Sequence, residues 1–177
     1  MLVGDAAVGK TSLITNFRLN KYDENYESTV LDVYKGKKNV DNKEVEIEIQ
    51  DTSGDDIFGV NRKVQYQGAD CFMICIACNA QESFDSIAKW KAEIMEVETD
   101  KPILLILTKK DLEDLVEEPV RIATLRQASK DQGFQGAMAT SSKVWEDFNV
   151  HTAFNKTLKT GLDFKYDNEN SSDDDEE

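Results

Sequence analysis

The chain begins with a stretch that could hold phosphate, Gly4 to Ser12, which reads GDAAVGKTS and fits the pattern G-x-x-x-x-G-K-[ST]. Gly4 and Gly9 allow tight turns in which successive backbone N–H groups point at one anion. The N-terminus of a following helix would add its dipole at the same place. Lys10 would bring a positive charge to the β- and γ-phosphates, and Thr11 would offer a hydroxyl to Mg²⁺. The spacing therefore predicts a site for a nucleoside triphosphate.

A second polar segment, Asp51–Gly54, directly follows a stretch of alternating apolar and charged residues that is typical of a strand. The Asp51 carboxylate could hold Mg²⁺ through water, opposite Thr11. Gly54 has no side chain, so its N–H could approach a γ-phosphate closely. An ordinary Asp–Gly turn would look the same in isolation, and the phosphate loop upstream is what favours the metal site.

A third polar segment, Thr108–Asp111, follows an apolar run and could recognise a base. The Asp111 carboxylate can accept hydrogen bonds from both N1–H and the 2-amino group of guanine, a pair of donors that adenine lacks. The aliphatic stem of Lys109 could lie over the face of the purine. A fourth segment, Ser141–Lys143, follows the next expected strand. These segments predict that the nucleotide is a guanine nucleotide.

Strands and helices are expected to alternate along the chain. The end of a first strand is predicted at Met1–Val3, and further strands are predicted at Val30–Val40, Glu44–Gln50, Cys71–Ala77, Pro102–Leu107 and Gly136–Thr140, with a hairpin connection at Asp41–Lys43. Helices are predicted at Lys10–Leu19, Ser83–Val97, Val120–Gln132 and Asn149–Leu162. This order indicates an α/β fold, with a six-stranded, mostly parallel sheet, one antiparallel edge strand and helices on both faces. Such sheets bind ligands at the carboxyl ends of their strands, so all four polar segments are expected to meet there.

The composition fits one domain at residues 1–162 and an acidic, disordered tail at residues 163–177. The formal net charge of -14 argues against a nucleic acid partner, because an acidic protein repels phosphate backbones. No apolar run of about 18 residues and no secretory leader is found, so we expect no membrane-spanning segment. Cys71, Cys75 and Cys78 lie in one apolar run and are expected to be buried thiols in a reducing compartment. The protein is therefore expected to be cytoplasmic. It is also expected to be a monomer.

Together these motifs resemble those of the Ras-superfamily small GTPases, whose fold is the G domain of the P-loop NTPases. The resemblance covers nearly the whole chain. The phosphate loop is similar to that of Rho proteins in Asp5 and Ala7. The other three segments resemble the family's Asp-Thr-Ala-Gly, Asn/Thr-Lys-x-Asp and Thr-Ser-Ala-Lys motifs, and here they are Asp51–Gly54, Thr108–Asp111 and Thr140–Lys143.

The segment Tyr26–Tyr34 resembles the family's switch I, with Thr29 in the place of the threonine that senses Mg²⁺ and the γ-phosphate. Tyr22 lies where an aromatic ring packs on guanine. Tyr66–Asp70 and Ser83–Trp90 look more like Rab proteins than Rho proteins. The chain is therefore identified as a divergent Rho/Rab-like member of the superfamily.

The resemblance implies a complete site for GTP or GDP with Mg²⁺. The nucleotide-binding residues would be Asp5, Ala6, Ala7, Val8, Gly9, Lys10, Thr11, Ser12, Tyr22, Tyr26, Thr29, Gly54, Thr108, Lys109, Asp111, Ser141, Ser142 and Lys143. The metal would be held by Thr11, Thr29 and, through water, Asp51. Catalysis would involve Lys10, Thr29 and Asp55. The implied partners are effector proteins, an exchange factor and a GTPase-activating protein.

Two residues depart from the family pattern in ways that bear on hydrolysis. Asp55 stands where the family has the glutamine that orients the attacking water, and a carboxylate offers no N–H to the transition state. Ala6 stands where Ras has glycine, and its methyl group could crowd an arginine finger from an activating protein. Slow hydrolysis and a weak response to activating proteins are predicted.

Three functions remain open at this point. The first is a switch that hydrolyses GTP slowly, and the second is a hydrolysis-deficient module that recruits partners while it holds GTP. The third is a P-loop kinase, which would need several arginines in a lid, whereas Arg18, Arg62, Arg121 and Arg126 are dispersed. No cysteine follows Cys78, so no lipid anchor is expected, and membrane association would depend on partners.

Overall fold

The computed structural model describes residues 1–22, 31–143 and 150–173, with side chains up to residue 168. The strands are β1 (Leu2–Val3), β2 (Leu31–Val40), β3 (Lys43–Thr52), β4 (Phe72–Ala77), β5 (Ile103–Thr108) and β6 (Ala137–Ala139). The helices are α1 (Lys10–Leu19), α2 (Gly59–Tyr66), α3 (Gln81–Asp85), α4 (Ile87–Met95), α5 (Ile122–Asp131) and α6 (Val150–Asp173). Two 3-10 helices are η1 (Asp56–Phe58) and η2 (Lys110–Leu115).

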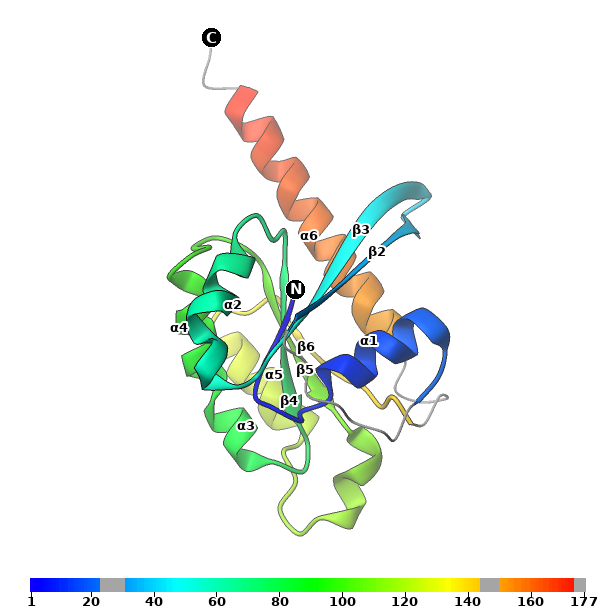
Figure 1. Ribbon diagram of the computed structural model, residues 1–177, viewed down its shortest axis with the longest axis vertical. Coiled ribbons are helices and arrows are strands. Elements are labelled where there is room, and N and C mark those ends of the chain that lie inside the picture. Colours follow the sequence, from blue (N-terminus) through cyan, green and yellow to red (C-terminus); the bar gives the residue numbers. More distant parts are fainter. Residues whose placement is uncertain (23–30, 144–149, 174–177) are drawn as a thin grey trace.

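These strands form one six-stranded sheet in the order β2-β3-β1-β4-β5-β6 (Figure 1). Among the described strands, β2 and β3 pair in antiparallel fashion, and the other neighbours are parallel. Helices α1 and α6 cover one face of the sheet, and α2, α4 and α5 cover the other (Figure 1). The α/β fold that the alternating pattern predicted is thereby confirmed.

Each face of the sheet has its own apolar core. On one face, Leu13 and Phe17 of α1 pack with Phe154 of α6, and the Phe17 and Phe154 rings stack with centroids 4.2 Å apart. On the other face, the fully buried Trp90 of α4 packs with the apolar side chains of β4 and β5. Because both faces are covered, β4 and β5 are buried along their whole length, as continuous apolar runs require.

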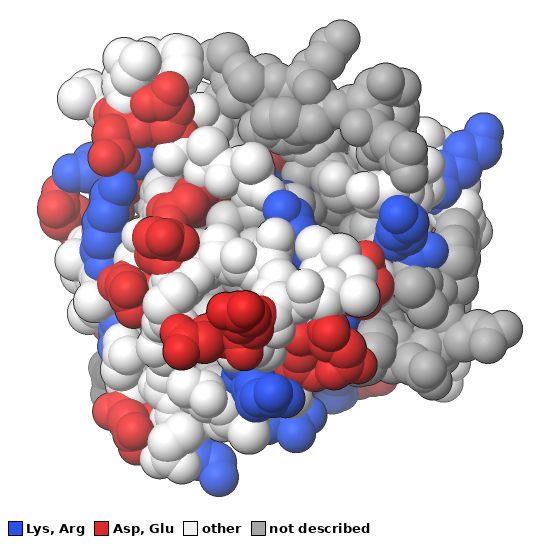
Figure 2. Space-filling model, turned by 90° about the horizontal axis from the view of Figure 1, so that it is seen from below, with Lys and Arg blue, Asp and Glu red and all other residues white. Residues whose placement is uncertain are grey.

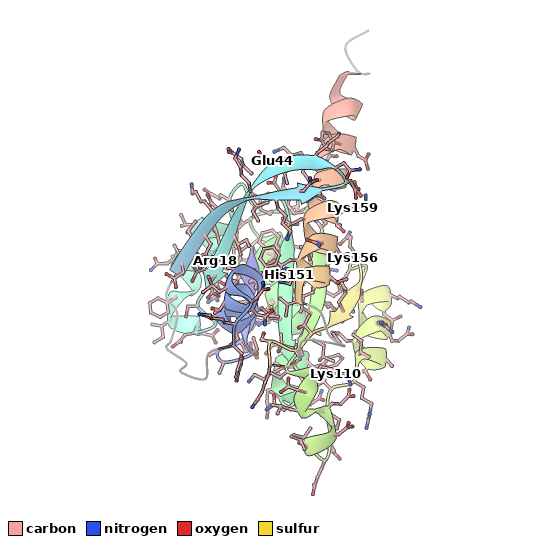
Figure 3. The ribbon with its side chains drawn as sticks, turned by 90° about the vertical axis from the view of Figure 1, so that its right-hand side faces the viewer. Arg18, Glu44, Lys110, His151, Lys156 and Lys159 are labelled. Carbon is pink, nitrogen blue, oxygen red and sulfur yellow. The ribbon has the colours of Figure 1, made fainter. Side chains whose placement is uncertain are left out.

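The β2–β3 hairpin turns at Asp41 and Asn42, which both adopt positive φ, 48° and 63°. Two such residues form the tight turn that matches the twist of antiparallel strands, so the expected hairpin connection is confirmed. Lys159 of α6 forms an ion pair with Asp41, and Figure 3 shows Lys159 beside this hairpin. The contact ties the turn of the edge hairpin to the last helix.

Two helix predictions differ from the structure. The helix expected at Ser83–Val97 is two helices, α3 and α4, that meet at Ser86, and α3 begins two residues earlier, at Gln81, with the Ser83 N–H donating to the Ala80 carbonyl in its first turn. The last helix does not end at Leu162 but runs on to Asp173, across the boundary at which a disordered tail was expected to begin. Acidic composition alone does not end a helix, and no glycine or proline follows Gly161 in this stretch.

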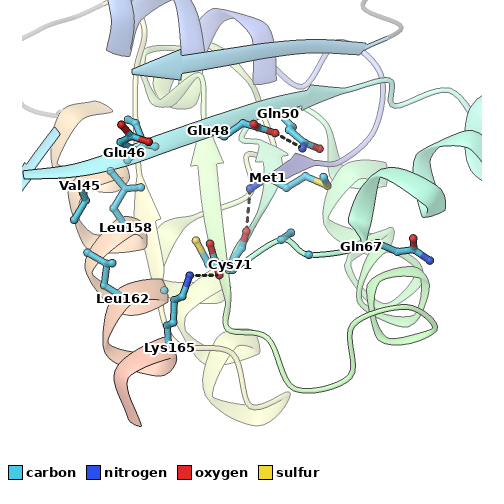
Figure 4. Close-up of a pocket in the computed structure, with 15 residues that line it drawn as sticks. Met1, Val45, Glu46, Glu48, Gln50, Gln67, Cys71, Leu158, Leu162 and Lys165 are labelled. Atoms are coloured by element: carbon cyan, nitrogen blue, oxygen red, sulfur yellow. Dashed lines mark hydrogen bonds and ion pairs between the residues drawn. The ribbon is translucent and has the colours of Figure 1, made fainter. Parts of the chain in front are cut away.

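The central strand β1 is short, and a groove lies in line with its N-terminal end (Figure 4). The α-amino group of Met1 donates to the Cys71 carbonyl at 2.9 Å, and the Met73 N–H donates to the Met1 carbonyl at 2.9 Å, in parallel-ladder fashion. The groove has a volume of about 400 Å³ and is lined by β3, residues 67–71 and α6. It lies at the opposite end of β1 from the phosphate loop.

The three cysteines are all free thiols, as the sequence predicted. Cys75 and Cys78 are buried, and burial raises the pKa of the Cys75 thiol to about 12. Cys71, which was expected to be buried, is half-buried at the rim of the groove. Within the described ranges, none of the helices has the length and apolar character needed to cross a membrane.

Candidate nucleotide-binding site

The phosphate loop joins β1 to α1 and folds as a ring of turns. Gly4, Ala7 and Gly9 have φ angles of 138°, 60° and 102°. A Cβ at Gly4 would lie 2.4 Å from the carbonyl oxygen of Cys75, so only glycine fits there beside β4. Gly9 directly precedes the first turn of α1. The loop is therefore a cradle whose backbone faces the N-terminus of a helix, as anion binding requires.

Lys10 lies in this cradle with its side chain almost fully buried. Its Nζ donates to the carbonyl oxygens of Gly4 at 2.7 Å and Asp5 at 2.8 Å. Burial lowers the pKa of the Lys10 ammonium, because a charge loses hydration in the protein interior. A bound phosphate anion would add a negative charge beside this ammonium and favour its charged form.

Thr11 and Asp51 meet across the site. The Thr11 hydroxyl donates to Oδ2 of Asp51 at 2.6 Å, and the Asp51 carboxylate is fully buried at the end of β3. A hydroxyl and a carboxylate are the hard oxygen donors that Mg²⁺ prefers, so this pair fits the implied metal. Thr29, the third expected ligand, lies outside the described residues, as does Tyr26.

The two expected base-binding segments lie side by side after β5 and β6. The Ser141 hydroxyl donates to Oδ1 of Asp111 at 2.6 Å and fixes that carboxylate. The Thr108 hydroxyl donates to the carbonyl of Val8, so this segment is joined to the phosphate loop. Lys109, at a positive φ of 54°, places its stem over Gly9. The structure thus brings the phosphate and base segments together at one edge of the sheet.

The remaining predicted residues lie around this edge. Lys143 Nζ lies 5.8 Å from the centroid of the exposed Tyr22 ring, and the carbonyl of Ser142 accepts a hydrogen bond from Asn16 of α1. Ala6 and Ala7 are exposed in the loop, Val8 is buried, and Ser12 lies in the first turn of α1. Figure 2 views the molecule from this side and shows acidic and basic side chains interspersed around the described part of the edge.

Gly54 and Asp55 lie directly against the phosphate loop. A Cβ at Gly54 would be 2.3 Å from the Ala6 nitrogen, so the backbone of this segment touches the cradle. The exposed Asp55 side chain accepts a hydrogen bond from the Ile57 N–H at 3.1 Å and caps η1. Its carboxylate is thus engaged by its own backbone.

Several residues of the site were not foreseen from the sequence. Asn16 and Cys78 bond to the carbonyls of Ser142 and Lys109, and no motif marks them. Trp90 was assigned to a helix core, but its indole N–H donates to Asp5 at 2.8 Å. A buried tryptophan needs a partner for that N–H, which is the one sequence signal that could have indicated a polar neighbour.

The sheet order, with a phosphate cradle at the end of its central strand, defines a P-loop nucleotide-binding protein. A family model described as the Ras family matches residues 1–163, and the chain belongs to that family. It is similar to the Rho-related GTP-binding protein RhoV of Rattus norvegicus, at 37% identity over 69% of this chain and 52% of RhoV. It is also similar to the Rho-related GTP-binding protein RhoE of Homo sapiens, at 35% identity over 90% of this chain and 72% of RhoE.

These relatives make the chain a divergent, Rho-like member of the Ras superfamily. The chain spans about half the length of RhoV, the first of these relatives. The predicted recognition of the superfamily and of the P-loop fold is confirmed.

Proposed function

We propose that this chain is a guanine-nucleotide switch that binds GTP and GDP with Mg²⁺ and hydrolyses GTP slowly. The observation that carries the proposal is the Thr108–Val8 hydrogen bond, which joins the base segment to the phosphate loop. A nucleotide whose phosphates lie on the cradle would then have its base beside Asp111. The names of the related proteins, both GTP-binding, support guanine as that base.

Each group of the site has a defined role in this proposal. Lys10 and the loop N–H groups bind the β- and γ-phosphates, and the Asp111 carboxylate accepts the two donors of guanine. Thr11, Thr29 and, through water, Asp51 would hold Mg²⁺, which supplies positive charge against the phosphate oxygens. The N–H of Gly54 meets the γ-phosphate, so the segment after β3 responds to the difference between GTP and GDP.

Slow hydrolysis is supported by the place of Asp55. Its carboxylate already accepts the Ile57 N–H, and a negative group beside the γ-phosphate opposes the charge that develops there. Ala6 is exposed at the mouth of the loop, where its methyl group would meet an arginine finger. The same geometry favours the second candidate, a module that stays GTP-bound and recruits partners.

The surface next to the site offers a place for effector and regulator proteins. Ile57, Val60 and Val64 are 82%, 80% and 67% exposed and lie on η1 and α2, directly after Asp55. Exposed apolar side chains gathered on one segment are typical of protein interaction sites. Val33 of β2 is exposed as well. Phe58 of η1 is half-buried, so it offers less apolar surface to a partner than its neighbour Ile57 does. We propose that effectors, an exchange factor and an activating protein dock here on a monomer.

The free thiols are consistent with a cytoplasmic protein, which partners would recruit to membranes.

The test of the proposed function is the nucleotide that co-purifies with the chain, released by denaturation and identified by chromatography. Guanine nucleotide at about one equivalent is expected, and ATP should not compete with labelled GDP. Bound ATP, or equal competition by ATP and GTP, would favour a kinase. Incubation then separates a slow switch, which accumulates GDP, from a module that keeps GTP.

A further inference from the structure

Arg62, on α2, is a charged residue with almost no exposed surface, at 2%. Its Nη1 donates to two backbone carbonyls of the segment after β3, those of Ser53 at 2.8 Å and Asp55 at 2.9 Å. These two carbonyls flank Gly54. The guanidinium is therefore hydrogen-bonded to the backbone segment that lies against the phosphate loop.

The other side of the guanidinium is held by Glu93 of α4. Nε and Nη2 of Arg62 donate to Oε1 and Oε2 of Glu93 at 2.7 and 2.9 Å, a bidentate pair, and the Tyr66 hydroxyl donates to Oε1 at 2.6 Å. Burial opposes both charges, yet their mutual hydrogen bonds leave the pKa of Arg62 raised and the pKa of Glu93 lowered. Both groups therefore stay charged, and four hydrogen bonds from Arg62 and one from Tyr66 orient the pair.

Trp90 lies almost one turn before Glu93 on α4 and connects this cluster to the phosphate loop. The Arg62 guanidinium carbon lies 4.5 Å from the centroid of the Trp90 ring. The indole Nε1 donates to Oδ1 of Asp5 at 2.8 Å, and Asp5 is a residue of the cradle. One rigid helix thus fixes both Arg62 and the loop against which Gly54 lies.

We propose that Arg62 is a positioning residue for GTP, which holds Gly54 against the phosphate loop so that its N–H meets the γ-phosphate. Glu93 and Trp90 set the place of Arg62 relative to that loop. The inference rests on the proposed guanine-nucleotide switch. It adds to that proposal the residues that set the affinity for GTP relative to the affinity for GDP. GDP has no γ-phosphate, so loss of the Arg62 bonds weakens GTP binding more than GDP binding.

A neighbouring ion pair between α2 and the C-terminal end of α4 gives a matched control. Lys63 of α2 pairs with Glu96, the residue that directly follows α4, and this pair is exposed. The test variant is Arg62→Met with Glu93→Gln, which leaves no buried charge without a partner. The control variant is Lys63→Met with Glu96→Gln.

The experiment measures the dissociation rates of fluorescent GDP and of a fluorescent, non-hydrolysable GTP analogue in Mg²⁺ buffer. In the test variant we expect the analogue to leave at least about tenfold faster, with the GDP rate changed less than about threefold. In the control variant both rates should stay within about twofold of the parent chain. Equal acceleration of both nucleotides, or no acceleration of either, would overturn the inference.

A second variant keeps the test open if the double substitution prevents folding. Trp90→Phe retains an aromatic ring under Arg62 and removes the N–H that bonds to Asp5, together with the pyrrole part of the buried indole. It should speed release of the analogue about threefold and speed GDP release less, as loss of one hydrogen bond to the half-buried Asp5 carboxylate predicts. An unchanged ratio of the two rates in this variant would contradict the role of α4. If the unsubstituted chain binds neither nucleotide, the proposed function itself fails, which is a separate outcome.

Discussion

The hydroxyl of Thr11 and the carboxylate of Asp51 are joined by a hydrogen bond of 2.6 Å, although forty residues separate them in the chain. One belongs to the first turn of α1 and the other to the end of β3. The parallel pairing of Leu2 with Asp51 brings these two ends together. The sheet register therefore sets the distance between the two groups proposed to share Mg²⁺.

The first prediction concerns this pair. Chelation of Mg²⁺ should speed GDP release from the parent chain by about tenfold or more, because the phosphates lose their cation. Asp51→Asn should release GDP fast in Mg²⁺ buffer and respond little to chelator. The rates can be followed with a fluorescent GDP. Asp56→Asn is the control, because Asp56 is exposed and pairs with Lys89 outside the cradle. A chelator response of parental size in Asp51→Asn would contradict the assignment.

The second prediction concerns turnover. Asp55→Gln removes a negative charge beside the γ-phosphate and supplies an amide that can both donate to and accept from water. Single-turnover hydrolysis of radiolabelled GTP should rise by roughly 10²-fold. The neighbouring exposed residue provides the control, Asp56→Gln, which should leave the rate as it is. If the parent chain already hydrolyses GTP as fast as Asp55→Gln does, slow turnover is not caused by this residue.

The third prediction concerns the choice of base. Asp111→Asn leaves an amide that can accept only one of the two guanine donors and turns an N–H₂ toward the other. GDP affinity should fall about 10- to 100-fold, as expected for lost charge-assisted hydrogen bonds, and titration calorimetry would measure it. Asp114→Asn is the matched control, since Asp114 is exposed in the same short helix η2. Equal affinities of both variants would place the base elsewhere.

How much of this site could be predicted from the sequence depends on how local each contact is. The phosphate loop and the start of α1 are encoded by consecutive residues, and the helix begins at Lys10 as expected. The meeting of Asp111 with Ser141 followed from strand order alone, because carboxyl ends of parallel strands share one edge. The buried ion pair of Arg62 could not be predicted, because a lone arginine in a polar stretch gives no sign that it will pair with Glu93 of another helix in the interior.

Gly54 provides the last prediction, because its backbone lies against the Asp5–Ala6 peptide. A Cβ there would be 2.3 Å from the Ala6 nitrogen and 2.6 Å from the Asp5 carbonyl oxygen, so Gly54→Ala must push the segment away from the cradle. Gly36→Ala is the control, because among the described residues, apart from its own chain neighbours, no atom lies within 4 Å of a Cβ at that position. We expect Gly54→Ala to lower affinity for a non-hydrolysable GTP analogue by at least about tenfold and to leave GDP affinity within about threefold. The thermal midpoint of the GDP-bound protein should change little. An unchanged midpoint would show that the lost affinity comes from local displacement of the segment and not from unfolding of the whole domain. An equal loss of both nucleotides would show that Gly54 supports the cradle itself and does not sense the γ-phosphate.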